Sequence, residues 1–131
     1  MHAPFLLIFI NFSIIIFYNL IVFGCVIMKN YNVNNLIYFV NSSFKNKSYN
    51  LTLKLLEELI KRDKTFYKAY CLLGYIIFIK SENKKKKLKQ AIKYFDISIK
   101  LQKYYPLSYY YKIKSKKKLM KINGKEAVSY T

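Results

Sequence analysis

The sequence predicts an all-α protein preceded by one long apolar helix, and three observations lead to this prediction. The first 28 residues contain no Asp, Glu, Lys or Arg, so the whole formal net charge of +18 falls on the rest of the 131-residue chain. Beyond residue 30, apolar residues recur at helical spacing rather than in alternation. That part of the chain holds only one Pro. A chain of this length allows one modest domain and excludes a multidomain enzyme.

Residues 4–28 form an apolar run that is long enough to cross a membrane. A helix rises about 1.5 Å per residue, so about 20 apolar residues span the roughly 30 Å hydrocarbon core. Lys29, Lys45 and Lys47 follow the run, whereas no Lys or Arg precedes it. Because positive residues stay on the cytoplasmic side, we expect residues 1–28 to be a single-pass membrane anchor, with the rest of the chain in the cytoplasm.

Four other interpretations of the apolar run stay open. It could be the central helix of a soluble bundle, or a cleavable secretory signal, although such signals begin with a basic region and have a shorter apolar stretch. The segment from Ile21 to Cys25 also resembles a lipoprotein signal in which Cys25 would be acylated. Finally, Met28 followed by Lys29 would make an ordinary start, and the run would then be an upstream extension.

Three amphipathic helices are expected in the charged part of the chain. Apolar residues at helical spacing place them at about Tyr49 to Arg62, Tyr67 to Lys80 and Leu88 to Leu101. Residues 29–48 are expected to hold a degraded first helix and a linker, and residues 49–131 the helical repeats. Helices this short cannot bury a core alone, so we expect them to stack on their neighbours.

The second and third of these helices carry small and large residues in a characteristic order. These are Tyr70, Leu73, Gly74, Ile77, Ala91 and Phe95. The set resembles the tetratricopeptide repeat (TPR) family, whose repeat of about 34 residues has the pattern W-x2-L-G-x2-Y followed by A-x3-F. The resemblance implies antiparallel helix pairs stacked as a short solenoid. In that fold Gly74 and Ala91 would let paired helices approach closely, while the larger residues fill the space between them.

One repeat matches well, so the expected solenoid has two degenerate repeats and a truncated third. In the first repeat, Leu36 and Val40 stand where the family has an aromatic residue and Gly. In the second, residues 81–87 add length, which we expect in the turn or at the helix ends. The third begins near Pro106, and a further helix is expected from Lys125. Such arrays need about three repeats and a cap, so either another subunit completes the stack or the chain is a piece of a longer array.

No catalytic or metal-binding constellation is recognisable in the sequence. The only His is His2, and there is no Ser/His/Asp set, no Gly-rich phosphate loop and no His/Cys cluster with metal-ligand spacing. Cys25 and Cys71 are the only cysteines, so there is no disulfide framework. Glu57 and Glu58 are adjacent on a helix and therefore point in different directions. We expect no enzyme activity and no cofactor.

The TPR resemblance implies a concave face, formed by the first helix of each repeat, that holds a segment of another protein. The corresponding positions of this chain are Asn34, Ile37, Asn41, Phe44, Lys68, Cys71, Tyr75, Phe78 and Ile79. Such a face would be apolar and aromatic with a single Lys. We therefore expect a protein or peptide as partner, with self-association as a further outcome. The alternative is that Tyr75 and Phe78 simply pack against the next helix.

Two lysine-rich stretches, Lys84 to Lys87 and Lys112 to Lys121, suggest an anionic partner, because a domain with a net charge of +18 attracts polyanions at low salt. However, only one of the 24 basic residues is Arg, and Arg is the residue that reads and stacks on bases. The sequence therefore disfavours specific nucleic-acid recognition, and a membrane headgroup layer is the nearer anion. A soluble basic binder that starts at Met28 and a non-autonomous fragment stay open as alternatives to an anchored adaptor.

Overall fold

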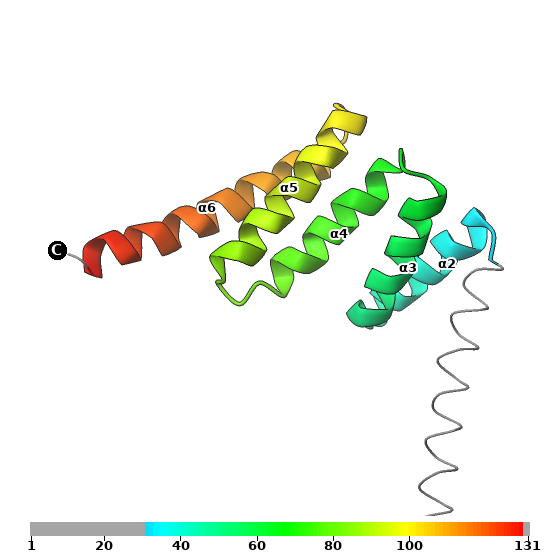
Figure 1. Ribbon diagram of the computed structural model, residues 1–131, viewed down its shortest axis with the longest axis horizontal. Coiled ribbons are helices and arrows are strands. Elements are labelled where there is room, and N and C mark those ends of the chain that lie inside the picture. The colour runs from blue at the N-terminus through cyan, green and yellow to red at the C-terminus, as the bar shows by residue number, and fades with distance from the viewer. Residues whose placement is uncertain (1–30, 130–131) are drawn as a thin grey trace, which may run out of the picture.

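The computed structural model describes residues 31–129, with side chains through Lys125, and this part of the chain is all helical (Figure 1). It contains five helices and no strand. The helices are α2 (Val33–Lys45), α3 (Tyr49–Arg62), α4 (Tyr67–Ile79), α5 (Lys85–Leu101) and α6 (Pro106–Ser129). The predicted all-α fold is therefore confirmed for the described residues.

The predicted membrane anchor at residues 4–28, together with Cys25 and Met28, lies outside the described residues. Within residues 31–129, no helix is both long enough and apolar enough to cross a bilayer. The longest of them, the 24-residue α6, has the length but carries lysines at close intervals.

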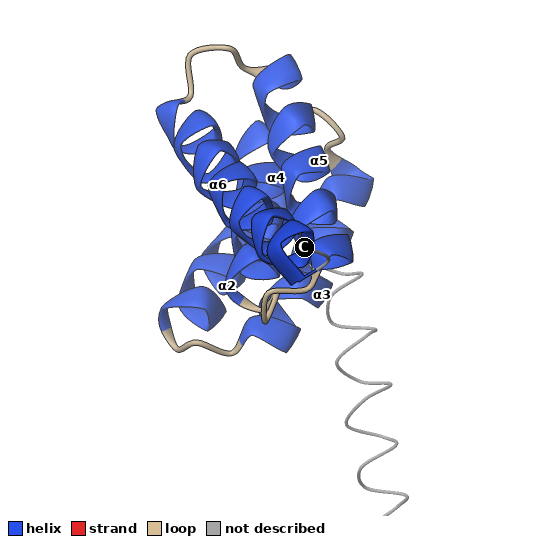
Figure 2. Ribbon diagram, turned by 90° about the vertical axis from the view of Figure 1, so that its left-hand side faces the viewer, coloured by secondary structure: helices blue, strands red, loops and turns tan. Residues whose placement is uncertain are grey.

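Each helix packs against the next one along the chain, so that the helices follow one another across the molecule (Figure 1). α2 packs on α3, α4 packs on both α3 and α5, and α5 packs on α6. Short connections reverse the chain between neighbours, as Figure 2 shows from the side of α6. A smaller contact joins α4 to α6, and it brings together two of the helices that line the groove described below.

The predicted helix bounds agree closely with the structure. α3 has the predicted ends, and α4 ends one residue earlier than predicted. α5 begins at Lys85 rather than at Leu88, so the extra residues of this repeat lengthen the helix. The turn before it stays short because the backbone N–H of Lys84 donates a hydrogen bond to the carbonyl of Ser81 at 2.8 Å.

Residues 29–48, predicted as a degraded helix and a linker, contain the complete helix α2. Asn32 caps its start, because the Asn32 side-chain oxygen accepts a hydrogen bond from the backbone N–H of Asn35 at 2.8 Å. Leu36 and Val40 are one helical turn apart and are both buried. Packing of this face against α3 explains why the helix forms although its repeat pattern is weak.

The C-terminal part of the chain corrects one expectation, because no new helix begins at Lys125. α6 instead runs without a break from Pro106 to Ser129. Proline at the first helical position lacks only an N–H that would be unpaired there. Farther along, Gly124 has open space around it, and glycine in an exposed helix interior costs only about 1 kcal/mol. The helix therefore continues through the Asn123-Gly124 pair.

Two connected clusters of buried side chains form the core. The larger one joins α2, α3 and one face of α4, and consists of Leu36, Val40, Leu55, Leu56, Leu59, Ala69, Leu73 and Ile76. The smaller one joins α4 to α5 and consists of Cys71, Ala91 and Phe95, with Tyr111 of α6 packed against it. Ile77 contacts both clusters, so the core is continuous along the stack of helices.

The predicted close contact at Gly74 is present, and its partner is the ring of Phe95. A Cβ atom added to Gly74 would lie 2.8 Å from the Phe95 Cε1 atom, which is nearer than carbon atoms approach. Phe95 and Ala91 are one turn apart on α5 and are both fully buried. Tyr70, which was also expected to fill the space between the helices, is half-buried and outside both core clusters. Phe95 is the residue that meets Gly74.

Small hydroxyl side chains also lie where helices meet, and they hydrogen-bond to one another. The Ser43 and Thr52 oxygens are 2.7 Å apart between α2 and α3. The Ser98 and Ser108 oxygens are also 2.7 Å apart, between α5 and α6, and Ser98 donates to the carbonyl of Tyr67 at 2.9 Å. All four side chains are buried, and pairing them avoids the penalty of an unsatisfied polar group.

Candidate partner-binding groove

A cavity of about 390 Å³ opens between α2, α4 and the start of α6, and we call it the inner groove. Its lining residues are Asn41, Phe44, Lys68, Cys71, Leu72, Tyr75, Tyr105, Leu107 and Tyr111. Five of them were predicted for the concave face, namely Asn41, Phe44, Lys68, Cys71 and Tyr75. The structure therefore brings these five together in one place, although they come from two helices.

Helical spacing explains why these side chains share one surface. On α4, Lys68, Cys71 and Tyr75 are three and then four residues apart, which places them on one face. On α6, Leu107 and Tyr111 are four residues apart in the same way. Other positions of α4 are buried against α3 and α5, which is why the helix is apolar nearly all round.

Aromatic rings connect the three helices that line the inner groove. The Phe44 ring of α2 meets the Tyr75 ring of α4 edge to face, with the ring centroids 5.8 Å apart. Tyr75 in turn meets Tyr111 of α6 at 4.7 Å. Such edge-to-face pairs contribute about 0.5–1.5 kcal/mol each beyond their buried area. The row of rings therefore fixes the spacing between the helices and gives the groove a rigid floor.

The lining of the inner groove is uncharged except at Lys68. Burial raises the pKa of the Cys71 thiol above its ordinary value, and a hydrogen bond with Ser108 acts in the opposite direction. Burial likewise raises the pKa of Tyr105 and of Tyr111. These groups stay protonated at neutral pH, so Cys71 is not an activated nucleophile. Lys68 is the one charged residue among the lining residues.

Four residues predicted for the concave face lie elsewhere. Asn34 is exposed on α2, and Ile79 is exposed at the end of α4. Ile37 packs against the larger core cluster and lines an adjoining cavity of about 400 Å³. Phe78 lines a different, lysine-rich cavity. The groove is therefore shorter than a face built from all nine positions.

The predicted alternative, packing against the next helix, also describes part of what is observed, because Tyr75 and Phe78 pack against the smaller core cluster that includes Ala91 and Phe95 of α5. The Tyr75 and Phe78 rings both lie close to Tyr111 of α6, with centroid distances of 4.7 and 6.4 Å. Phe78 is not among the lining residues of the inner groove. Tyr75 both packs against Tyr111 and lines the groove.

Sequence reasoning missed the contribution of the segment just before and within α6. Tyr105, Leu107 and Tyr111 form one wall of the groove. The signal was present as a run of tyrosines around Pro106, but it was interpreted only as the beginning of a third repeat. The direction of α6 across α4 decides which of those tyrosines face the groove, and that direction depends on packing against α5.

No arrangement suited to a metal ion is present in the part of the chain that the structure describes, where no three His, Cys, Asp or Glu side chains gather. The described residues thus define an all-helical protein in which successive helix hairpins pack side by side around an aromatic groove. Comparison with known proteins adds no relative, because no family model, curated protein or solved structure matches the chain.

Proposed function

We propose that the chain is a non-catalytic, TPR-like adaptor that binds a segment of another protein in the inner groove. The observation that supports this proposal is the convergence of Asn41, Phe44, Lys68, Cys71 and Tyr75 on one cavity. Its volume falls within the range of about 300–1,000 Å³ that is usual for ligand pockets. The order of small and large residues in α4 and α5 supports the TPR likeness.

The lining residues specify the chemistry of the partner. An apolar and aromatic surface favours a segment that presents one or two apolar side chains, since their burial is the main driving force for such binding. Lys68 is the only fixed charge, so an acidic group on the partner would pair with it. The Asn41 amide and the tyrosine hydroxyls would hydrogen-bond to the partner's backbone.

Peptides selected from a random display library against the protein would test this proposal. We expect the selected peptides to contain an aromatic or large aliphatic residue next to an acidic one. Leu107→Asp places a charge in the groove, where Leu107 is 47 % exposed, and should weaken their binding at least about tenfold. Leu101→Asp is the matched control, because Leu101 is 39 % exposed and does not line the groove.

The salt dependence of the same binding separates the proposal from its main alternative, a soluble basic protein that binds polyanions. Binding through an apolar groove should change little between about 50 and 200 mM salt, whereas counterion release makes polyanion binding fall steeply over this range. Selected peptides that are merely acidic, and that bind Leu107→Asp as well as the original protein, would contradict the groove proposal.

We further propose that residues 4–28 tether the adaptor to a membrane, on the strength of the apolar run in the sequence. The expressed chain should then stay with the membrane fraction after a carbonate wash. Recovery of the full chain in the supernatant would remove the tether. Mass spectrometry of the mature N-terminus would separate an uncleaved anchor from acylation at Cys25 and from a start at Met28.

A further inference from the structure

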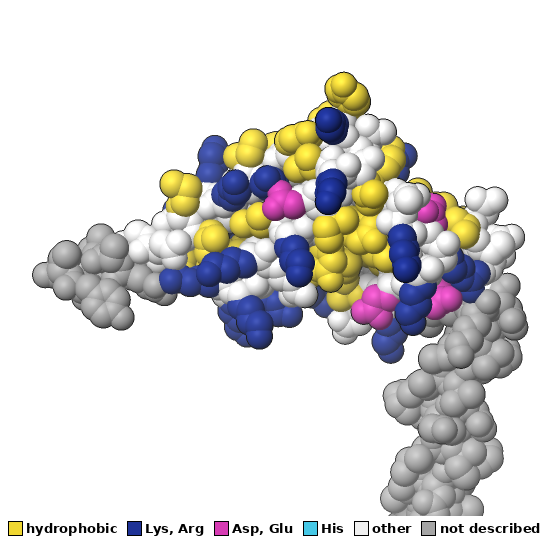
Figure 3. All heavy atoms as spheres, turned by 45° about the horizontal axis from the view of Figure 1, so that its top comes forward, with side chains coloured by type: hydrophobic (Ala, Val, Ile, Leu, Met, Phe, Trp, Pro, Cys, Tyr) yellow, Lys and Arg dark blue, Asp and Glu magenta, His cyan; other side chains and the backbone are white. Residues whose placement is uncertain are grey.

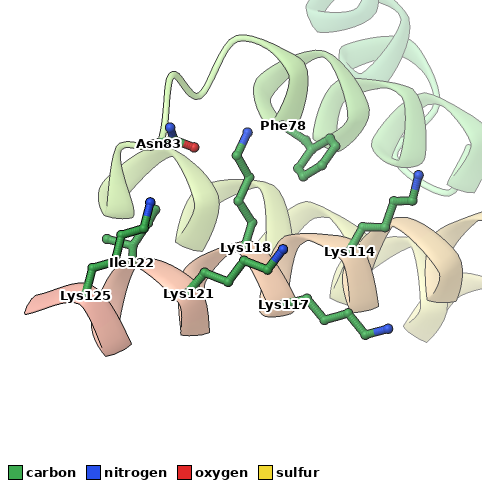
Figure 4. Close-up of a pocket in the computed structure, with 8 residues that line it drawn as sticks. All are labelled: Phe78, Asn83, Lys114, Lys117, Lys118, Lys121, Ile122 and Lys125. Carbon is green, nitrogen blue, oxygen red and sulfur yellow. The ribbon is translucent and has the colours of Figure 1, made fainter. Parts of the chain in front are cut away.

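A second cavity, of about 630 Å³, lies between the stretch of α6 from Lys114 to Lys125, the end of α4 and the α4–α5 turn. We call it the lysine pocket, and its lining residues are Phe78, Asn83, Lys114, Lys117, Lys118, Lys121, Ile122 and Lys125 (Figure 4). We propose that the lysine pocket binds a compact, multiply phosphorylated ligand, either as a free molecule or as the headgroup of a lipid.

The geometry concentrates positive charge on one side of α6. Four of the five lysines, Lys114, Lys118, Lys121 and Lys125, are separated by four, three and four residues, so they follow one face of the helix over about 16 Å. Figure 4 shows Lys118 and Lys125 rising from α6 towards the turn that carries Asn83, whereas Lys117 points away from that turn. The lining side chains of the pocket therefore come from α6 and from the end of α4 with the turn after it, which are far apart in sequence.

Among the side chains that the structure describes, no acidic one lies in this pocket to neutralise the charge. Asp96 instead binds Lys112, with its Oδ1 atom 2.6 Å from the lysine Nζ. Lys121 and Lys125 form no ion pair with any described residue. Figure 3 shows the same imbalance on one face of the molecule, where basic side chains are common and acidic ones are few.

The neighbouring start of α5 increases the positive potential. Lys84 to Lys87 occupy the N-cap and first turn of that helix, and this first turn contains no acidic residue. The N-terminus of a helix already carries a partial positive charge and favours anions. These lysines follow directly after Asn83, a lining residue of the pocket. An anion held there would relieve repulsion among several ammonium groups at once.

The non-charged lining residues narrow the choice of ligand. Phe78 and Ile122 give the cavity an apolar wall, which suits a compact carbon skeleton between phosphate groups. Lysine binds phosphate as a point charge. Nucleic-acid grooves instead use several free aromatic faces on which bases stack. Here Phe78 is the one aromatic lining residue, and the Lys118 Nζ atom already lies 5.2 Å from its ring centroid.

The test compares two double variants of the full chain that remove equal charge. Lys121→Gln with Lys125→Gln changes the pocket, and Lys89→Gln with Lys93→Gln changes exposed positions of α5 that do not line it. Both pairs are four residues apart on a helix. Circular dichroism would establish that all three proteins have the same helix content.

Three probes are used with each protein. Inorganic tripolyphosphate, titrated calorimetrically, represents a free ligand. Vesicles of phosphatidylcholine with and without phosphatidylinositol bisphosphate represent a lipid headgroup, and the difference in flotation between the two compositions is the readout. A single-stranded RNA oligonucleotide represents a nucleic acid.

Each lysine near an anionic surface contributes about a fivefold factor to binding. We therefore expect the pocket variant to lose about thirtyfold in affinity for tripolyphosphate or for the bisphosphate vesicles, and the α5 variant to lose less than about threefold. Binding of tripolyphosphate alone would identify a free ligand, and binding of the vesicles alone a lipid headgroup. Either result supports the pocket.

Three outcomes would overturn the proposal. The first is equal weakening by the two double variants, which would mean that the charge acts diffusely. The second is that neither tripolyphosphate nor the bisphosphate vesicles bind. The third is tighter binding of RNA than of both other probes, which would identify the surface as a general nucleic-acid patch.

Discussion

Gly74 lies at a close contact between α4 and α5, where one added methyl group would have no room. Its substitution to Ala would bring a Cβ atom to 2.8 Å from Cε1 of Phe95, and Phe95 is fully buried and cannot swing away. We expect Gly74→Ala to lower the free energy of unfolding by about 1–3 kcal/mol through overpacking. Thermal unfolding followed by circular dichroism measures the change.

Gly124 provides the control for this prediction, since it is also a helical glycine. Nothing lies within 4 Å of a Cβ atom added there. Gly124→Ala should therefore raise the free energy of unfolding by about 0.5–1 kcal/mol, because alanine loses less conformational freedom in a helix. If both substitutions had the same sign, the contact between Gly74 and Phe95 would not be as close as described.

Buried serines provide a second prediction with opposite signs. The Ser81 hydroxyl is fully buried and has no hydrogen-bond partner among the residues that the structure describes, so Ser81→Ala should stabilise the fold by about 1 kcal/mol. The Ser98 hydroxyl bonds to both Ser108 and the carbonyl of Tyr67, so Ser98→Ala should destabilise it by about 1–3 kcal/mol. Urea unfolding of both variants compares them directly. A loss of stability in Ser81→Ala would show that its hydroxyl is hydrogen-bonded.

At the level of elements, the start of α5 is an unfavourable helix end, because four lysines occupy its N-cap and first turn. Lys84 occupies the N-cap with an extended backbone but makes no side-chain cap hydrogen bond. Lys84→Asp would supply both a cap acceptor and a negative charge at the positive end of the helix. We expect it to raise the free energy of unfolding by about 1–2 kcal/mol, measured by thermal unfolding.

Lys84→Gln separates the two contributions in this experiment. It removes the same positive charge but caps a helix poorly, so we expect it to give only about 0.3–1 kcal/mol. An Asp variant no more stable than the Gln variant would mean that the cap hydrogen bond does not form. A decrease in stability with both would mean that α5 does not begin where the structure places it.

The elements differ in how far the sequence predicts them. α3 has one leucine stripe and one charged flank, so its ends follow from periodicity alone. α4 is apolar on nearly all sides, and its bounds follow from the turn residues that flank it. The continuity of α6 through Asn123 and Gly124 is harder to predict, because this pair is common in turns. The sequence predicts a groove residue where helical spacing within one helix fixes the face on which the residue lies, as for Lys68 and Tyr75. The contribution of Tyr111 could not be predicted in this way, because its place in the groove depends on how α6 crosses α4.

At the scale of the whole molecule, 24 basic residues against 6 acidic ones give a net charge of +18 on a small fold. Self-repulsion of this size destabilises a compact state. Part of this repulsion acts between ammonium groups that are close in the structure, since five lysines line one cavity and four more lie at the start of α5. Stability should therefore depend on ionic strength to a degree that is unusual for a protein with an apolar core.

We expect the melting temperature of the full chain to rise when NaCl is increased from about 20 to 200 mM, because the screening length shortens from roughly 20 Å to below 10 Å. A gain of about 1 kcal/mol corresponds to about 4–8 °C for a domain of this size. An uncharged osmolyte at the same osmolality controls for general solvent effects.

Lys84→Asp should reduce the salt dependence, because it removes one repelling charge and adds an attracting one where lysines are densest. A melting temperature that stays constant or falls with salt would mean that the lysines are too far apart, and too well solvated, to repel one another appreciably. That result would also contradict the electrostatic argument for an anion in the lysine pocket.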